Sequence, residues 1–475
     1  MVQIFLLKYS LLNPEILMSD LNFINNKHLV WRAGFGIGIS QVAEIRKLKR
    51  KDLLKELFTE DHSETIKYTT ADIEPVDYEA SKATAEMRNQ IQKVNQKQNQ
   101  ELNLNFLQKM VSSKAQLQEK MAFFWHGHFA TRINNPKFNK HQLNIIRKNA
   151  LGNFKDLLFE VSKSPAMLNF LNNQQNKKGH PNENFAREVM ELFTMGIGNY
   201  TETDIREAAR AFTGWGYDKP GNFVERPKQH DDGTKLFLGK TGNFSGDDVL
   251  NIILEQKATA RFITSKIYKF FVNEKADQNI ITGLSENFYQ SGYDIKKLMT
   301  EIFSSDWFYD QKNIGNRIKS PTELMVGMMR ILPMSIQNPE NLVVYQKLLG
   351  QTLLSPPNVS GWPSGKSWID SSTLMLRLQI PQIWSGLRPL DLSPKEDDDV
   401  EMGMKSREAL KKSFKNPNIT IDWEKVEKVF SKKDCEDFLL SKPDQMSMNA
   451  VQNFSDKSIK INIINLMSTP EYQLM

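Results

Sequence analysis

The sequence predicts a mainly α-helical globular protein, a multi-helix array with at most a small β-hairpin and one rigid loop rich in Pro, Gly and Trp. Three observations lead to this class. Apolar residues recur at helical spacing through most of the chain, helix-capping signatures precede several of these stretches, and strand-like alternation is weak. Hydrophobic residues make up 40% and aromatic residues 10% of the 475 residues, which is enough for a packed core.

Charge and cysteine content narrow the class of protein. The net charge of +6 is a small difference between 62 basic and 56 acidic residues, which are interspersed. This pattern is typical of an ordinary solvated surface, so we expect no nucleic-acid partner. The single cysteine, Cys435, excludes an internal disulfide and a multi-cysteine metal site. No stretch of 18 apolar residues occurs, so we expect no membrane span.

We expect three segments: an N-terminal extension at 1–24, a main helical domain at 25–390 and a C-terminal helical tail at 391–475. The opening stretch is apolar but lacks a cationic start and a small-residue cleavage site, so it resembles a signal peptide poorly. The chain is therefore expected to be cytoplasmic as synthesised. The tail begins with an acidic run and then becomes rich in lysine.

The helices are predicted from periodicity and from their ends. A short helix at 26–33 ends at Gly34, and further helices follow near 39–47 and 52–58. Residues 78–118 contain neither Gly nor Pro and carry a thin apolar stripe at helical spacing. They predict one long exposed helix, with a low-complexity linker as the alternative.

Later helix starts are marked by capping boxes, in which a Ser or Thr hydroxyl and a carboxylate three residues later bind the free backbone N–H groups of the first turn. Ser320 with Glu323 is such a pair, Thr201 with Asp204 is a second, and Ser245 opens a helix through Ile253. A helix is also expected at 258–272. The weak strands at 223–224 and 234–238 are predicted to pair as a small hairpin.

Residues 355–370 form the rigid Pro/Gly/Trp loop. Trp362, Lys366 and Trp368 are candidate binding residues there, because aromatic side chains flanked by Pro and Gly suit contact with a protein or a polysaccharide. The alternative is that both tryptophans pack the loop onto the core.

A His-x-His pair, His126 and His128, follows a run of aromatic residues. In a continuous helix, side chains two positions apart diverge by about 200°, so these two converge only if the backbone turns at Gly127. A convergent pair of neutral imidazoles is a common metal-ligand arrangement. The alternative is two structural histidines among aromatic rings.

Two further pairs of residues, Glu188 with Glu191 and His230 with Asp231, are candidates for metal binding or catalysis. On a helical wheel, Glu188 borders the buried stripe and Glu191 lies farther from it, so Glu188 needs an arginine, a metal or a helix N-terminus as partner. Arg187 and Arg206 are candidate structural partners. His230 and Asp231 precede a glycine turn and could ligate a metal or act as base and orienter, or could simply be turn residues.

Together these residues predict a metal-assisted enzyme as the first hypothesis. His126, His128 and His230 would bind a divalent metal ion, and Glu188 or Asp231 would complete its ligands. Glu191 would act as the general base or orient a ligand, with Asp231 as a second candidate catalytic residue.

The chain resembles the bacterial family known as domain of unknown function 1800. The matching stretches are HLVWRAGFG (28–36), KMAFFWHGHF (120–129), 182–215, 230–256, ARFITSKIYKFFV (260–272), SPTELMVG (320–327) and 349–378. The resemblance implies a mainly helical fold and no established activity. It also implies that the His-x-His, Glu-x-x-Glu and His-Asp positions recur in relatives. Many members have a histidine where this chain has Phe193, which weakens any metal site that needs it.

The resemblance also implies a second hypothesis. Many members are encoded beside a second family of unknown function, number 1501, which is similar to the phosphatase and sulfatase group and often carries an export signal. The chain would then be a non-catalytic binding or scaffold protein that acts with this partner and reaches the periplasm bound to it.

Overall fold

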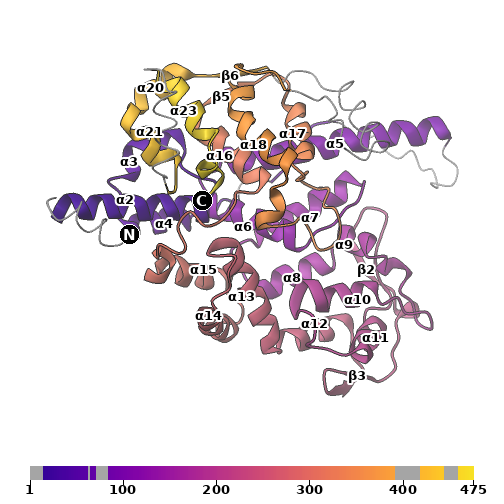
Figure 1. Cartoon of the computed structure of the whole chain (residues 1–475). Helices are drawn as coiled ribbons and strands as arrows, with labels where there is room; N and C mark the ends of the chain where they lie inside the picture. Colours follow the sequence, from indigo (N-terminus) through magenta and orange to yellow (C-terminus); the bar gives the residue numbers. More distant parts are fainter. Residues whose placement is uncertain (1–13, 63–64, 71–83, 391–417, 443–457) are drawn as a thin grey trace.

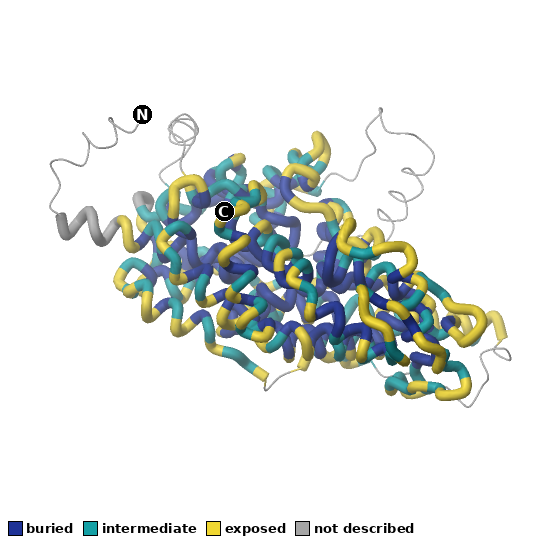
Figure 2. The backbone as a smooth tube through the Cα atoms, turned by 90° about the horizontal axis from the view of Figure 1, so that it is seen from below, coloured by how far each residue is buried: buried dark blue, intermediate teal, exposed yellow. Residues whose placement is uncertain are grey.

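The structure is a computed structural model, which describes residues 14–62, 65–70, 84–390, 418–442 and 458–475. Helices dominate these residues, and strands form three two-stranded antiparallel sheets among them. The mainly α-helical class is therefore confirmed. Figure 2 shows buried backbone running through the middle of the molecule, with exposed segments at its rim.

The chain opens with helix α2 (Pro14–Ala33), followed by η1 (Ile39–Gln41), α3 (Val42–Ile45) and α4 (Arg50–Leu57). Helix α2 ends at the position that Gly34 predicts, but it begins well before residue 26. The expected extension at 1–24 therefore overlaps this helix, and its first 13 residues lie outside the described residues.

The predicted long helix is present as α5 (Ala85–Ser112), which projects from the body in Figure 1. Its first half is largely exposed, whereas Leu102, Phe106 and Met110 in its second half are buried. After a break at Ser113, the chain continues as α6 (Gln116–His128). Residues 71–83, which include the expected start of the long helix, lie outside the described residues.

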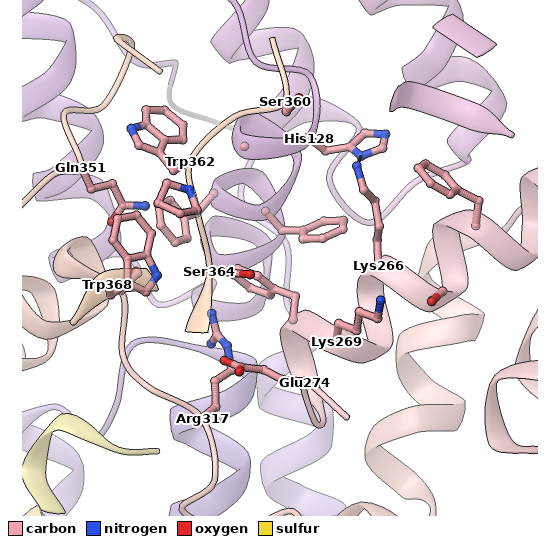
Figure 3. A pocket seen from close by; sticks show the side chains of 18 residues that line it. His128, Lys266, Lys269, Glu274, Arg317, Gln351, Ser360, Trp362, Ser364 and Trp368 are labelled. Carbon is pink, nitrogen blue, oxygen red and sulfur yellow. Dashed lines mark hydrogen bonds between the residues drawn. The ribbon is translucent and has the colours of Figure 1, made fainter. Parts of the chain in front are cut away.

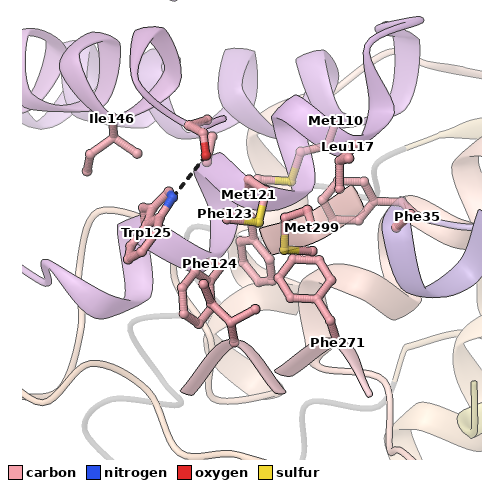
Figure 4. Packing of buried hydrophobic residues seen from close by; sticks show 14 of the residues in the cluster. Phe35, Met110, Leu117, Met121, Phe123, Phe124, Trp125, Ile146, Phe271 and Met299 are labelled. Carbon is pink, nitrogen blue, oxygen red and sulfur yellow. Dashed lines mark hydrogen bonds between the residues drawn. The ribbon is translucent and has the colours of Figure 1, made fainter. Parts of the chain in front are cut away.

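Helix α6 crosses the middle of the core. Figure 4 shows Met121, Phe123, Phe124 and Trp125 packed against residues from several other elements: Phe35, Met110, Phe271 and Met299. The indole Nε1 of Trp125 donates a hydrogen bond to the carbonyl of Ala150 at 3.1 Å. This packing fixes the position of His126 and His128 at the end of the helix.

The middle of the chain is a succession of helices: α7 (Pro136–Lys148), α8 (Phe154–Ser162), α9 (Pro165–Phe170), η3 (Asn173–Gln175), α10 (Asn184–Glu188), η4 (Val189–Thr194), α11 (Glu202–Ala211), η5 (Pro227–Gln229), α12 (Gly246–Leu254), α13 (Lys257–Phe271), α14 (Gln278–Gln290) and α15 (Ile295–Ser304). The η4 segment is a π-helix. The capping box predicted at Thr201 is confirmed at the start of α11, and the helix predicted to open at Ser245 is confirmed as α12, where Ser245 forms a capping box with Asp248.

The strands pair differently from the prediction. Strand β1 (Trp215–Tyr217) pairs with β2 (Phe223–Glu225), and β3 (Lys235–Phe237) pairs with β4 (Lys240–Gly242). The expected pairing of 223–224 with 234–238 is therefore wrong. Each strand instead pairs with its neighbour in the sequence: residues 218–222 connect β1 and β2, and a two-residue turn connects β3 and β4. In that turn, Leu238 and Gly239 both have positive φ, which suits a two-residue hairpin.

The remaining elements are η6 (Asp306–Tyr309), α16 (Pro321–Ile331), β5 (Met334–Ile336), η7 (Pro339–Asn341), α17 (Leu342–Leu348), η8 (Gly365–Trp368), α18 (Ser371–Trp384), β6 (Ile419–Ile421), α20 (Trp423–Val429), α21 (Lys432–Leu439), α23 (Ile459–Met467) and η9 (Glu471–Gln473). The capping box at Ser320 is confirmed as the start of α16. No helix in the described ranges is long and apolar enough to cross a membrane.

The C-terminal residues share the core with the first helices. Strand β6 pairs with β5, and the amine of Lys27 in α2 donates hydrogen bonds to the carbonyls of Asp437 at 2.6 Å and Leu440 at 2.7 Å. The buried amine of Lys319 donates to the carbonyl of Tyr472. The described part of the expected tail at 391–475 is therefore packed into the main body of the protein.

Candidate ligand cavity

A cavity of about 570 Å³ lies between α6, α13 and the Pro/Gly/Trp loop. Its walls include Phe123 and Phe124 of α6, Phe262 and Phe270 of α13, and the loop residues Trp362 and Trp368. Figure 3 shows the tryptophans on one side and Lys266, extending toward His128, on the other. The volume lies within the roughly 300–1,000 Å³ typical of small-molecule sites.

Gly127 does not turn the backbone, because α6 is continuous through His128. Convergence of His126 and His128, which was expected only if the backbone turned there, does not occur, since in a regular helix the two side chains point to different sides. Gly127 has another role. A Cβ built on it would meet nothing within 4 Å, whereas a Cβ on Gly361 of the loop would collide with the Gly127 carbonyl. Gly361 therefore allows the loop to pack directly on α6, and the absence of a side chain at Gly127 leaves space in the cavity that it lines.

His126 holds this loop in place. Its Nε2 accepts a hydrogen bond from the backbone N–H of Leu354 at 3.1 Å, and its ring lies 5.3 Å from the ring of Trp362 between centroids. Because an N–H only donates, Nε2 carries the lone pair and Nδ1 carries the proton. Burial lowers the pKa of His126 to about 4, so the ring is neutral at neutral pH.

His128 lies between a carbonyl and an amine. Its Nε2 is 3.0 Å from the carbonyl oxygen of Phe193, and its Nδ1 is 3.2 Å from the Nζ of Lys266. The carbonyl only accepts, so Nε2 donates to it and Nδ1 accepts from Lys266. Burial, followed by the charge of Lys266, holds the pKa of His128 well below its usual range. With both nitrogens engaged, His128 has none free for a metal in this arrangement.

The π-helix η4 supplies the acceptors for both side chains. The last carbonyls of a helix lack partners within it, and here Phe193 accepts from His128 while Leu192 accepts from Lys266 at 3.2 Å. Single π-helical turns occur frequently at functional sites. The end of η4 thus forms the wall against which the Lys266 amine is held.

Positive charge dominates the cavity. Lys266 and Lys269 lie one turn apart on α13, and Arg317 and Glu274 lie together at the base (Figure 3). Among the lining residues, all of which the structure describes, Glu274 is the one carboxylate. Burial, with a smaller contribution from the charge of Lys269, lowers the pKa of Lys266 to about 8.

Arg317 forms a buried salt bridge with Glu323. Its Nη1 donates to Glu323 Oε1 at 2.8 Å, and its guanidinium lies 4.3 Å from the ring centroid of Phe270. Glu323 also binds the buried amine of Lys120 and caps α16 through the N–H of Ser320 at 2.7 Å. The arginine is therefore fixed in position before any ligand binds.

The acidic pair lies outside this cavity. Glu188 is half-buried, and burial and the charge of Glu191 raise its pKa, while Glu191 accepts a hydrogen bond from the Tyr200 hydroxyl at 3.1 Å. The helical wheel assumed an α-helix here, whereas a π-helix, which has more residues per turn, starts at Val189. The candidate partners are used elsewhere: Arg187 binds Glu183 and Glu202, and Arg206 binds Thr203.

His230 and Asp231 stabilise a turn. His230 Nδ1 lies 3.0 Å from the carbonyl of Thr213, and Asp231 binds Arg210 Nε at 2.8 Å and accepts from the N–H of Gly233 at 2.9 Å. The bond from Arg210 lowers the pKa of Asp231 to about 2. In this geometry the carboxylate is a weak base.

The predicted metal ligands thus lie in separate hydrogen-bond networks. Within the described ranges, no three His, Cys, Asp or Glu side chains come together as a metal ion requires. Of the predicted binding residues, Trp362 and Trp368 line the cavity, whereas Lys366 is exposed and outside its lining.

Sequence reasoning missed Lys266, Lys269 and Arg317. The first two stand at helical spacing in SKIYKFF, which is the signal that could have revealed them as a pair on one face of a helix. Arg317 has no motif around it, and only the fold brings it to α13.

These observations define the class of protein: a mainly α-helical array that encloses a basic cavity with aromatic walls. The family model described as "Protein of unknown function (DUF1800)" matches residues 28–474, so the chain belongs to this family. No curated protein and no solved structure matches the chain.

Proposed function

We propose that this protein binds a small organic anion that also has a flat or apolar part. The observation that carries the proposal is the lining of one cavity by Lys266, Lys269 and Arg317 with Glu274 as the opposing carboxylate. Three basic side chains face one carboxylate, so the lining has a surplus of positive charge. His128 is neutral and does not change this balance. A ligand carboxylate or phosphate would offset the surplus.

The aromatic walls of the cavity are the reason to propose that the ligand also has a flat or apolar part. Phe123, Phe124, Phe262 and the two tryptophans offer ring faces on which a planar or apolar group can stack. The hydroxyls of Ser265, Ser360 and Ser364 and the amide of Gln351 add polar contacts that can orient it. A mixed lining of this kind suits a small molecule better than a free inorganic ion.

Three expectations from the sequence stay predictions: the metal-assisted reaction, the phosphatase-like or sulfatase-like partner, and export with that partner. The first would need His126, His128 and His230 to leave the hydrogen bonds described above. The cavity proposal needs no rearrangement, and we therefore favour it.

The proposal is tested by thermal shift and calorimetry with aromatic carboxylates, sugar phosphates and their neutral analogues. We expect the anions to bind and the neutral analogues to bind more weakly. The affinity for the anions should fall at least about tenfold in Lys269→Gln, and it should also fall as the salt concentration rises. Lys257→Gln is the matched control, because it removes an exposed lysine from the same helix, where Lys257 pairs with Glu286 outside the cavity. Equal affinity for anions and neutral analogues would contradict the proposal.

A further inference from the structure

We infer that the amine of Lys266 is a nucleophile that forms an imine with the aldehyde or ketone group of an anionic ligand. The inference rests on the proposed function, since the cavity must first hold the anion. It assigns to the ligand a chemical class: an organic carbonyl compound with a carboxylate or phosphate group.

The hydrogen bonds of the amine give the geometric argument. A neutral lysine amine has two N–H bonds and one lone pair. Lys266 has an acceptor for each N–H, His128 Nδ1 and the Leu192 carbonyl, both at 3.2 Å. Both acceptors belong to the wall formed by α6 and η4, so the lone pair is left for the open side, where Lys266 lines the cavity. The wall therefore matches a neutral amine with its lone pair directed at a ligand.

The tautomer of His128 is what makes this arrangement possible. The carbonyl of Phe193 fixes the proton on Nε2, so Nδ1 is an acceptor and can take a proton from the amine during the reaction. The imidazolium formed would keep its Nε2–H bond to the same carbonyl. His128 thus acts as the base, and Phe193 orients it through its backbone.

The electrostatics support the geometry. With a pKa of about 8, roughly one Lys266 amine in ten is neutral at pH 7, about 300-fold more than for an ordinary lysine. Burial in an apolar site and a neighbouring cation are two known ways to activate a lysine, and the burial of Lys266 and the charge of Lys269 supply them here.

The step balances without an oxidant or a reductant. The lone pair of Nζ attacks the carbonyl carbon, and the C=O π electrons move to oxygen. The nitrogen loses one proton to His128 Nδ1, and His128 passes this proton to the oxygen, which gives the carbinolamine. The hydroxyl then leaves as water with a proton taken from the solvent, the nitrogen lone pair forms the C=N bond, and the remaining N–H proton of the protonated imine returns to the solvent. One imine and one water result from one amine and one carbonyl.

Pyridoxal 5′-phosphate is the probe, because it combines an aldehyde, an aromatic ring and a phosphate. After borohydride reduction, which converts the imine into a stable secondary amine, peptide mass spectrometry locates the label. We expect about one label per chain, on Lys266, with a rate that rises with a midpoint near pH 8. Glyoxylate, a small anionic aldehyde, is the second probe and should label the same residue.

Lys266→Arg and Lys266→Met should both lose this label, and their melting temperatures show whether they fold. Pyridoxine 5′-phosphate, which has an alcohol in place of the aldehyde, separates the two proposals and should bind the Lys266→Arg variant as it binds the wild type. If both probes label surface lysines and neither labels Lys266, the inference is overturned. The proposed function would still stand in that case, provided that pyridoxine 5′-phosphate binds. Failure of the alcohol to bind would count against the proposed function itself.

Discussion

Gly127 of α6 and Gly361 of the loop lie backbone against backbone, because a Cβ on Gly361 would collide with the Gly127 carbonyl. Gly361 also has a φ of +84°, which L side chains rarely adopt. The contact seats the loop, and with it Trp362, over the end of the central helix.

Gly361→Ala should therefore destabilise the protein by about 2–4 kcal/mol, through backbone strain and the collision together. Gly350→Ala is the matched control, since Gly350 has the same φ of +84° but open space around its Cβ position. It should cost only about 1–2 kcal/mol. Urea unfolding of both variants measures the difference, and equal losses would mean that the contact with Gly127 contributes nothing.

Gly127→Met should keep the fold and abolish ligand binding, because the space in front of Gly127 is part of the cavity. Gly127→Ala should instead stabilise the protein by up to about 1 kcal/mol, through the better helix propensity of alanine. Calorimetric titration of the folded variants checks this. Undiminished binding to Gly127→Met would place the ligand elsewhere.

Lys269→Gln should shift the pH midpoint of imine formation at Lys266 upward. The positive charge of Lys269 disfavours a second charge on Lys266 and so lowers its pKa, and removing it raises that pKa. The fraction of reactive amine at pH 7 then falls. The measurement is the labelling rate at saturating probe across pH 6–10, and an unchanged midpoint would show that Lys269 does not influence the amine.

His126→Gln should flatten the acid side of the stability profile. The folded-state pKa of His126 is lowered to about 4, below its usual 6.5, so the unfolded chain binds the proton first as pH falls. Stability from this group is present above pH 6.5 and is lost between about 6.5 and 4, by up to about 3 kcal/mol. Glutamine has no such titration, and denaturant midpoints at several pH values would reveal a smaller slope.

The same histidine separates a hydrogen-bond role from a metal role. His126→Ala leaves the buried N–H of Leu354 without its acceptor and should cost at least about 1–3 kcal/mol. We expect a chelator to leave the melting temperature of the wild type unchanged. If the chelator instead lowered the melting temperature of the wild type as much as His126→Ala does, and elemental analysis found stoichiometric metal, the metal hypothesis would be favoured.

The sequence predicted the helices whose ends it marks. Ser320, Thr201 and Ser245 were identifiable because capping depends on local hydrogen bonds within four residues. The cavity was beyond such reasoning. It joins α6, α13 and a loop that is more than 80 residues farther along the chain, and only long-range packing sets that arrangement.

The surroundings of the candidate site residues were hard to predict for related reasons. The helical wheel assumed a regular α-helix at Glu191, whereas the structure has a π-helix there. The His-x-His pair allowed two interpretations, convergent ligands or structural histidines, and in the structure each ring binds the backbone of a distant segment, Leu354 for His126 and Phe193 for His128. Backbone groups have no sequence signature, so their role as partners could not be foreseen.

The hydrogen bonds of Lys27 have a consequence for the way the chain folds. Its acceptors lie about 410 residues farther along, so a nascent chain contains this lysine long before it contains the two carbonyls. Contacts of such long sequence separation form slowly and favour intermediates. A chain that has not yet reached Leu440 would have to bury an ammonium group without its two carbonyls, so we expect α2 to take its final place only after these residues have been synthesised.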